Sequence, residues 1–199
     1  CTVIILSATL TASKRAELLG VPSNSMAYPL VSALPKDGNL ETIVVDTSEA
    51  AIVNIKIMHQ DEVAIEEALL RAERGEQILW IENVVADAQA LFKTLAGRSR
   101  SGSLKIELGL LHSRFQRKDR TYNEDKWVGI FGKDGHSQRI KCGRILIGTQ
   151  VLEQSLDIDA DFLITRICPT DMLFQRIGRL WRHRSTDILR PVDAKRESW

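Results

Sequence analysis

The sequence predicts an α/β fold, a mainly parallel sheet with helices on both faces. The first observation is that short apolar runs typical of buried strands alternate with stretches of helical length and period. The second is that polar residues follow the expected strand ends, where functional loops gather in parallel sheets: Asn83, His112, Thr149 and Arg166. With 199 residues, the chain is long enough for one domain of ordinary size and its extensions.

The expected elements begin with a helix over residues 12–19, which Gly20 ends. The following stretch to Gly38 contains proline and serine and is typical of a linker. Strands are expected over 40–45 and 52–59. The alternation then continues with a helix over 61–74, a strand over 77–82, a helix over 85–95, a strand over 104–111, a helix over 116–131, a strand over 144–147, a helix near Val151, a strand over 162–165 and a helix over 170–182. This order predicts parallel strands joined by helical crossovers.

The last expected helix carries an arginine-rich segment, Gln-Arg-Ile-Gly-Arg-Leu-Trp-Arg, at residues 175–182. At about 100° per helical residue, Gln175, Arg179 and Arg182 fall within an arc of roughly 60°. The other side of the wheel carries an apolar stripe that should anchor the helix: Leu173, Phe174, Ile177, Leu180 and Trp181. Guanidinium groups grip phosphate oxygens in bidentate fashion, so this face suits a polyphosphate. A solvated basic face is the alternative.

Two further segments precede it in the chain. After the apolar run 144–147 the sequence reads Gly-Thr-Gln-Val-Leu-Glu-Gln-Ser-Leu-Asp-Ile-Asp, from Gly148 to Asp159. A strand that ends in Gly-Thr and turns into a polar helix predicts an anion site at the start of that helix. Near the N-terminus, Ser7-Ala8-Thr9 follows the apolar run 3–6. The three segments together, in this order, are more specific than any one of them.

This order resembles the last three motifs of superfamily 2 helicases, usually called III, V and VI. Two segments resemble more narrowly the CRISPR-associated helicase-nuclease of type I interference: Leu-Leu-His-Ser-Arg-Phe at 110–115, followed by Asp119-Arg120, and the segment 148–157. The resemblance extends from about Gln77 to His183, and the first ten residues add motif III. It implies a RecA-like lobe, the fold of P-loop NTPases, here without the P-loop.

The resemblance also implies roles for individual residues. Arg179 and Arg182 match the arginine fingers, Gln175 a phosphate-binding residue, and Asp157 the acid that contacts the nucleotide ribose or its metal-bound water. The implied DNA contacts are Thr149, His112, Arg114 and Asn83, and for Asn83 loop-stabilising hydrogen bonds are the alternative. Ser7 and Thr9 are expected to link nucleotide state to lobe movement, with a loose terminus as the alternative, and Glu153 to couple the nucleotide and DNA sites. Arg176, about 80° away on the helical wheel, is expected to tie the lobe to its neighbours. Val84 stands where many relatives have a hydroxyl residue.

By the same resemblance, residues 1–38 are expected to end a first lobe and form the linker, 39–184 to form the second lobe, and 185–199 to lead toward a C-terminal region. The sequence contains neither a Gly-x-x-x-x-Gly-Lys-Ser/Thr loop nor an Asp-Glu-x-His or Asp-Glu-Ala-Asp box. We therefore expect ATP with Mg to bind between this lobe and a first lobe, and the chain alone to be inactive. Expected partners are single-stranded DNA, that first lobe, a nuclease domain and a Cascade-type surveillance complex. The alternatives are a lobe of another superfamily 2 RNA or DNA helicase, and a binding module without hydrolysis.

Composition limits the other classes of function. Apolar runs fall short of the roughly 18 to 20 residues that span a bilayer, so no membrane role is expected. The three cysteines lack C-x-x-C spacing, which favours a reducing, cytoplasmic location, and the four scattered histidines predict no metal site. The net charge of +1 does not indicate nucleic-acid binding, but its distribution does: residues 98–120 hold seven Lys or Arg and two acids. Such a basic strip suits a phosphate backbone, although for Arg98 and Arg100 a solvated loop is favoured.

Overall fold

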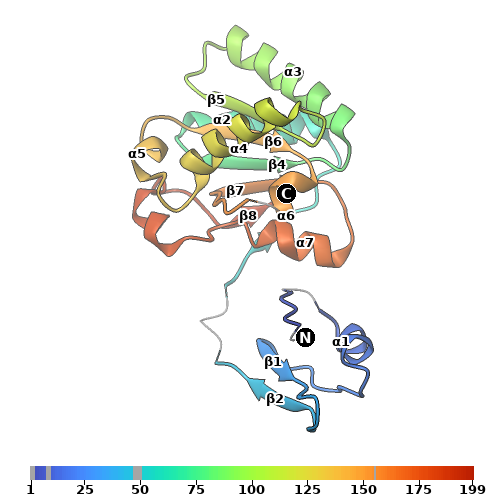
Figure 1. Ribbon diagram of the computed structural model, residues 1–199. Coiled ribbons are helices and arrows are strands. Elements are labelled where there is room, and N and C mark those ends of the chain that lie inside the picture. The colour runs from blue at the N-terminus through green and yellow to red at the C-terminus, as the bar shows by residue number, and fades with distance from the viewer. Residues whose placement is uncertain (1–2, 8–9, 47–50, 155) are drawn as a thin grey trace. The chain divides into compact units, whose positions relative to one another are not determined.

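The computed structural model describes residues 3–7, 10–46, 51–154 and 156–199, without the side chain of Gln154. Thr9 and Ser155 therefore lie outside the described residues. The chain forms two compact units, Cys1–Ile52 and Val53–Trp199. Figure 1 shows the elements of both units. The boundary lies between residues 52 and 53, and the lobe assignment of residues 1–38 stays a prediction.

The first unit contains one helix and a two-stranded antiparallel sheet. Helix α1 (Ala12–Leu19) is the predicted one: the Thr11 hydroxyl accepts the Lys14 amide at its start, and Gly20 ends it at φ 68°. Strand β2 (Glu41–Val44) was also predicted, and it pairs with β1 (Leu30–Ala33). Strand β1 was not predicted. It lies in the stretch between prolines that we interpreted as linker, because a four-residue strand is too short to show a clear period.

The second unit is built around a six-stranded sheet, and every strand pair in it is parallel. This confirms the predicted α/β fold. In spatial order the strands are β3 (Asn54–Ile55), β8 (Glu197–Ser198), β7 (Phe162–Thr165), β4 (Gln77–Ile81), β6 (Arg144–Gly148) and β5 (Glu107–Leu111). The predicted strand over 52–59 was too long, since only Asn54 and Ile55 pair with β8. Strand β8 lies in the segment expected to be a tail, and it is inserted between β3 and β7.

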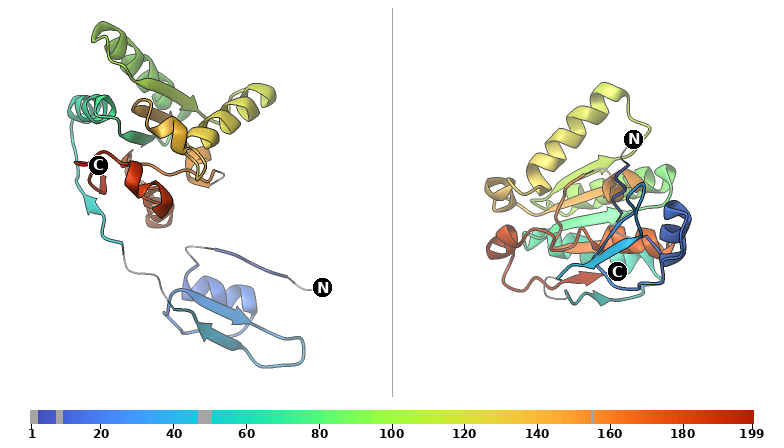
Figure 2. Two further views of the ribbon diagram at one scale, coloured as in Figure 1. Left: turned by 90° about the vertical axis from the view of Figure 1, so that its left-hand side faces the viewer. Right: turned by 60° about the horizontal axis from the view of Figure 1, so that its bottom comes forward.

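Helices cover both faces of this sheet, as Figure 2 shows in its left view. Helices α2 (Asp61–Glu73) and α3 (Val85–Ser101) pack on one face, and α4 (Arg117–Phe131) and α6 (Gln150–Gln154) on the other. The remaining helical segments are α5 (His136–Arg139), α7 (Thr170–Ile177) and the 3₁₀ helix η1 (Arg184–Leu189). None of the helices in the described part of the chain is both long and apolar enough to span a bilayer.

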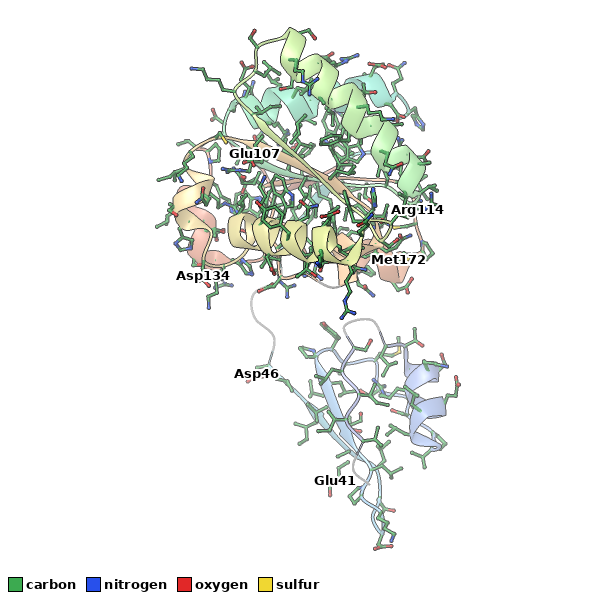
Figure 3. The ribbon with its side chains drawn as sticks, turned by 45° about the horizontal axis from the view of Figure 1, so that its top comes forward. Glu41, Asp46, Glu107, Arg114, Asp134 and Met172 are labelled. Atoms are coloured by element: carbon green, nitrogen blue, oxygen red, sulfur yellow. The ribbon has the colours of Figure 1, made fainter. Side chains whose placement is uncertain are left out.

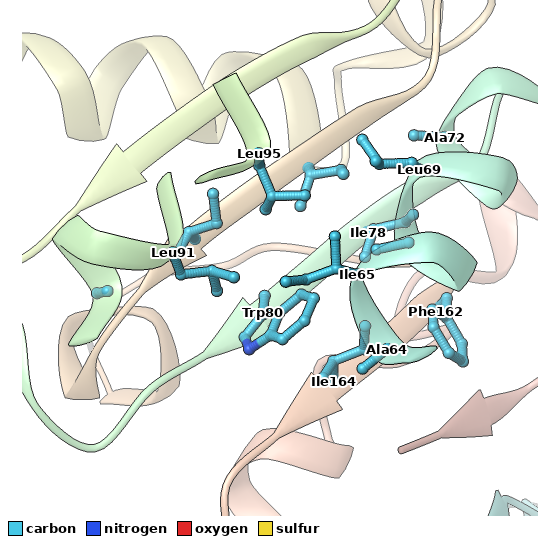
Figure 4. Packing of buried hydrophobic residues seen from close by; sticks show 14 residues of the cluster. Ala64, Ile65, Leu69, Ala72, Ile78, Trp80, Leu91, Leu95, Phe162 and Ile164 are labelled. Carbon is cyan, nitrogen blue, oxygen red and sulfur yellow. The ribbon is translucent and has the colours of Figure 1, made fainter. Parts of the chain in front are cut away.

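The pleat of the central strand explains how one apolar run serves two cores. In β4, Ile78 and Trp80 point to the cluster under α2 and α3, while Leu79 and Ile81 point to the cluster under α4 and α6. Figure 4 shows Trp80 of the first cluster among side chains of α2, α3 and β7. Because β4 is buried on both faces, its sequence is continuously apolar from Ile78 to Ile81 rather than alternating.

The arginine-rich helix is shorter than predicted, and this changes the expected site. Helix α7 ends at Ile177, with Gly178 as its C-cap, and not at Arg182. The next residues pair with Ala160 instead: its amide donates to the Arg179 carbonyl and its carbonyl accepts from the Trp181 amide, both at 2.9 Å. The prediction that Gln175, Arg179 and Arg182 share one helical face was therefore wrong. Phe174, expected in the anchoring stripe, is 61% exposed.

Candidate nucleotide and nucleic-acid site

The carboxyl ends of four neighbouring strands lie level at one edge of the sheet. Gly148, the last residue of β6, is in register with Ile81 of β4 and Leu111 of β5. Ile81 is in turn in register with Thr165, the last residue of β7. The polar residues that follow these strands are thereby brought to one edge, as the parallel topology requires. In Figure 3, Arg114, which follows β5, and Met172 of α7 lie on one side of the unit, and Glu107, the first residue of β5, and Asp134 lie on the other.

Thr149 begins the turn after β6 and is buried. Its amide donates to the Leu111 carbonyl at 3.3 Å, and its carbonyl accepts from the Leu152 amide at 2.9 Å, so the backbone is fixed between β5 and α6. The following side chain, Gln150, donates to the Asn83 carbonyl at 3.3 Å. Helix α6 has only five residues, so the anion site expected at its start rests on a short helix.

Asn83 contacts the loop after β7 and helix α7 through its side-chain amide, and helix α6 through its backbone carbonyl. Its Nδ2 donates to the Ile167 carbonyl at 2.9 Å, and its Oδ1 accepts from the Arg176 guanidinium at 3.0 Å. The side chain is exposed, yet both ends are engaged within the chain. These contacts are the loop-stabilising hydrogen bonds that we considered as its alternative role. A DNA contact from Asn83 stays a prediction.

His112 faces into the protein and orients the loop that carries Arg114. The residue is 3% exposed, its ring stacks on Phe115 at 4.3 Å between centroids, and one ring nitrogen contacts the Gln89 amide at 3.1 Å. The other nitrogen accepts the Arg114 amide at 3.3 Å. Burial lowers the pKa of His112, and the charge of Arg114 lowers it further. The ring thus has little surface for direct contact with DNA, and that contact stays a prediction, whereas Arg114 is exposed.

Arg166 differs from the other residues at strand ends because carboxylates already neutralise it. Its guanidinium forms a bidentate pair with Asp61 at 2.6 and 2.9 Å and contacts Glu82 at 2.8 Å. Glu82 is buried and also accepts the indole N–H of Trp80 at 3.0 Å. Arg166 is therefore held in an ion-pair cluster at the edge of the sheet.

Arg176 lies at the centre of the site and is 0% exposed. Its Nε donates to the Glu153 carboxylate at 2.7 Å, and its Nη1 donates to the Thr165 hydroxyl at 2.7 Å and to the Arg166 carbonyl at 3.3 Å. With the Asn83 contact, this guanidinium ties α6, the end of β7 and the loop after β4. We expected Arg176 to tie the lobe to its neighbours, but the contacts found in the described residues lie within the second unit.

Arg179 and Arg182 follow α7 in the chain, and their side chains contact the segment between β6 and β7. Arg179 is partly buried, and its Nη2 donates to the Glu153 carbonyl at 2.6 Å. Arg182 is 43% exposed in its side chain and pairs with Asp157 at 2.6 Å. Burial lowers the pKa of Arg179, as does the nearby charge of Arg182. Burial would raise the pKa of Asp157, but hydrogen bonds from Arg182 and His183 outweigh it, so that pKa is lowered.

A buried ion-pair cluster that we did not predict binds the backbone of residues 179–182, the arginine turn. Asp159 and Asp161 are buried and pair with Arg139 and Arg190, at 3.1 Å for Asp159–Arg139 and 2.9 Å for Asp159–Arg190. The other oxygen of Asp159 accepts the Arg182 amide at 2.7 Å. The acidic run 157–161 was the available signal, because burial of carboxylates demands cationic partners. Those partners lie far along the chain and could not be chosen from spacing.

The structure thus joins Glu153 to Arg179 and Asp157 to Arg182, and it joins Asn83 to Gln150, the residue after Thr149. Gln175 lies partly buried on α7. Ser7 belongs to the first unit. Within the described residues no group of three or more His, Cys, Asp or Glu side chains could hold a metal ion.

A parallel sheet with a strand–threonine turn and an arginine turn at one edge defines the second unit as a RecA-like helicase lobe. Dbp5 of S. cerevisiae shares the fold at a TM-score of 0.52 and 18% identity, over 87% of this chain and 40% of that chain. T. fusca Cas3 with ADP is more similar, with a TM-score of 0.78 at 26% identity, over 94% of this chain and 24% of that chain.

The family follows from sequence. The family model for the CRISPR-associated nuclease/helicase Cas3, C-terminal, matches residues 74–185. The Cas3 endonuclease/helicase of Escherichia coli (strain K12) is 35% identical over 197 residues, which is 91% of this chain and 22% of that protein. The chain belongs to the Cas3 nuclease/helicase family, as the resemblance predicted. It spans about a fifth of the length of the first curated relatives it matches.

Proposed function

We propose that this chain is the second motor lobe of an ATP-dependent single-strand DNA translocase that acts with a nuclease in CRISPR interference. The observation that carries the proposal is the path of residues 148–159. This segment begins at the strand edge with Thr149 and ends against the arginine turn, where Asp157 holds Arg182. One short segment therefore touches both the proposed DNA side and the proposed nucleotide side. The first lobe, with the phosphate-binding loop and the nuclease, would come from a longer protein.

The nucleotide side fits a polyphosphate. The Nε of Arg179 is buried and has no hydrogen-bond partner among the described residues, and the Arg182 side chain is 43% exposed. A phosphate would compete with the Asp157 carboxylate for Arg182. For Arg179 it would replace only a hydrogen bond to the neutral carbonyl of Glu153. ATP with Mg, when bound, supplies the phosphoryl group whose developing charge arginines stabilise. Gln175 of α7 would contribute a further phosphate contact, and Asp157 a contact to the ribose or to metal-bound water.

The DNA side fits a phosphate backbone. Arg114, Arg117 and Lys118 are exposed around the start of α4, and in the described part of the chain none of them pairs with a carboxylate. Arg98, by contrast, is paired with Glu62 and Glu66 and has no need of a nucleic-acid partner. Contacts from such cations, with Thr149, would hold a strand without reading its sequence.

The wider context of the proposal comes from the relatives. The curated relatives are named nucleases and helicases, and a neighbouring structure is titled a CRISPR RNA-guided surveillance complex, pre-nicking. We extend this to a cytoplasmic protein that meets a Cascade-type complex and a nuclease domain. Ser7, Thr9 and Glu153 keep the coupling role that the resemblance implies.

The test is ATP turnover and DNA affinity of the complete protein that contains this chain. Arg179→Ala and Arg182→Ala should each reduce turnover by about a thousandfold, the scale of a transition-state arginine. Thr149→Ala should weaken DNA binding more than nucleotide binding. Arg184→Ala is the matched control, because Arg184 is an exposed arginine of η1 next to the turn. Near-normal turnover in both arginine variants, or DNA binding without any hydrolysis by the complete protein, would contradict the proposal.

A further inference from the structure

Arg176 occupies a position that a structural role alone does not require. Among the described residues its guanidinium pairs with one carboxylate, Glu153 of α6, and its other donors reach the side chains of Thr165, at the end of β7, and of Asn83, in the loop after β4. A buried charge needs a carboxylate partner, which Glu153 supplies. The additional contacts fix the relative positions of a helix, a strand end and a loop at one edge of the sheet, which a planar fork with several donors can do and a lysine cannot.

The contacts of Arg176 form a continuous path between the two proposed sites. Gln150 Nε2 donates to the Asn83 carbonyl at 3.3 Å, and Arg176 joins Asn83 at 3.0 Å to Glu153 at 2.7 Å. The Glu153 carbonyl then accepts from Arg179 at 2.6 Å. The first member of the path follows Thr149 directly, and the last is a proposed arginine finger. Networks of this kind can carry coupling between sites when they have two discrete arrangements.

Two buried atoms at the far end of the path are unpaired. Glu153 Oε1, an acceptor, and Arg179 Nε, a donor, have no hydrogen-bond partners among the residues that the structure describes. Buried polar atoms are ordinarily paired. Arg179 meets Glu153 only through the backbone carbonyl, so each of the two side chains has an unused atom that a second arrangement of the path would satisfy.

We propose that Arg176 is a positioning residue that makes ATP turnover depend on single-stranded DNA, an inference that rests on the proposed function. A strand bound at Thr149 and Gln150 displaces the Asn83 loop, and Arg176 transmits this displacement to Glu153 and so to the resting place of Arg179. Arg176 itself touches neither ligand. Its effect is on the ratio between turnover with DNA and turnover without it.

The experiment measures that ratio in the complete protein, with and without a saturating poly-thymidine oligonucleotide. Arg176→Lys keeps a charge opposite Glu153 but cannot reach all three partners, and it should lower the stimulation ratio by about tenfold, within the range of measured coupling. Arg144→Lys is the matched control. Arg144 is also buried, with one carboxylate partner, Glu107, at 2.8 Å, and it bonds an amide and backbone carbonyls at the other end of the sheet. It should keep the wild-type ratio.

A second variant keeps the inference testable should Arg176→Lys fail to fold. Asn83→Ala removes the other end of the same link from an exposed position, and at saturating DNA it should lower the ratio to a similar extent. In the double variant the two effects should not add, because both cut one path.

Absence of stimulation in the wild-type protein would refute the proposed function. Stimulation that survives in Arg176→Lys and Asn83→Ala, or that is lost equally in Arg144→Lys, would overturn the role of Arg176 alone.

Discussion

Glu76 makes the stability of the second unit depend on pH in a direction opposite to that of most carboxylates. It lies directly before β4 and is 3% exposed, and the one cation that pairs with it among the described residues is Arg71, at 3.3 Å. Arg71 is shared with Glu67 and Glu197, both at 2.6 Å. Burial therefore outweighs the attraction of Arg71 and raises the pKa of Glu76 from 4.5 to about 7.

The sign follows from proton binding. Between pH 4.5 and about 7 the folded protein holds a proton on Glu76 that the unfolded chain has lost, so the free energy of unfolding falls as pH rises through this window. A difference of this size in pKa corresponds to about 3 kcal/mol. This contribution is fully present below pH 4.5 and is lost above about pH 7. Glu76→Gln removes the titration while it keeps the shape and an acceptor for Arg71.

The assay is urea unfolding of the 199-residue chain followed by tryptophan fluorescence. It reports on the second unit, which contains all four tryptophans: Trp80, Trp127, Trp181 and Trp199. Wild type should lose about 3 kcal/mol relative to Glu76→Gln between pH 4.5 and 7.5. A gap between the two proteins that does not change with pH would refute the reasoning.

Glu107→Gln is the control of opposite sign. Burial would raise the pKa of Glu107, but hydrogen bonds from Lys126 and Arg144 outweigh it and hold that pKa below its ordinary value. Wild type should therefore lose stability relative to Glu107→Gln as the pH falls through the acidic range, and not as it rises.

Three further predictions concern packing, DNA and ATP. Gly109→Ala would place a Cβ 2.2 Å from the ring of buried Trp127 and should cost about 3 kcal/mol of stability. A Cβ at Gly97 of α3 meets nothing within 4 Å, so Gly97→Ala should gain about 0.5 to 1 kcal/mol. Equal thermal midpoints for the two variants would contradict this. The chain alone should bind single strands weakly, and Arg117→Gln with Lys118→Gln should lower the slope of log affinity against log salt by roughly 1.4; a slope that stays unchanged would exclude these two contacts. The chain alone should not hydrolyse ATP, and turnover that Arg182→Ala abolishes would show otherwise.

The second unit could be predicted largely from local pattern. Strand β7 (Phe162–Thr165) and the starts of α2 and α3 agree with the prediction, because each has a run of clear period and a clear boundary. Strands β3 and β8 have two residues each and exist only because they pair with each other and with β7. The local pattern predicted β3 only as part of a longer strand over 52–59, and it gives no signal for β8, whose partner β3 lies at the opposite end of the unit in sequence.

The helical geometry of the arginine segment was predicted wrongly, and the roles of its residues stay predictions. The helical wheel placed Arg179 with Gln175 because Gly178 alone does not fix a helix end. What ends α7 there is the pairing of residues 179–181 with Ala160, a tertiary contact. The contacts of the His112 ring with Phe115 and the Gln89 amide were not predicted either, and its contact with DNA stays a prediction. Such contacts depend on neighbours that spacing along the chain does not specify.

The three arginines of the segment illustrate how surroundings divide one residue type into different functions. Arg176 is buried against the Glu153 carboxylate, so its charge is neutralised and cannot reach a ligand. Arg182 is accessible but pairs with Asp157, so a phosphate must displace a carboxylate to bind it. Arg179 alone rests on a neutral carbonyl, in partly buried surroundings where its charge is poorly solvated. In the proposed nucleotide site a phosphate would therefore gain most from Arg179, since that contact requires no ion pair to be broken and the low local polarity would strengthen the attraction.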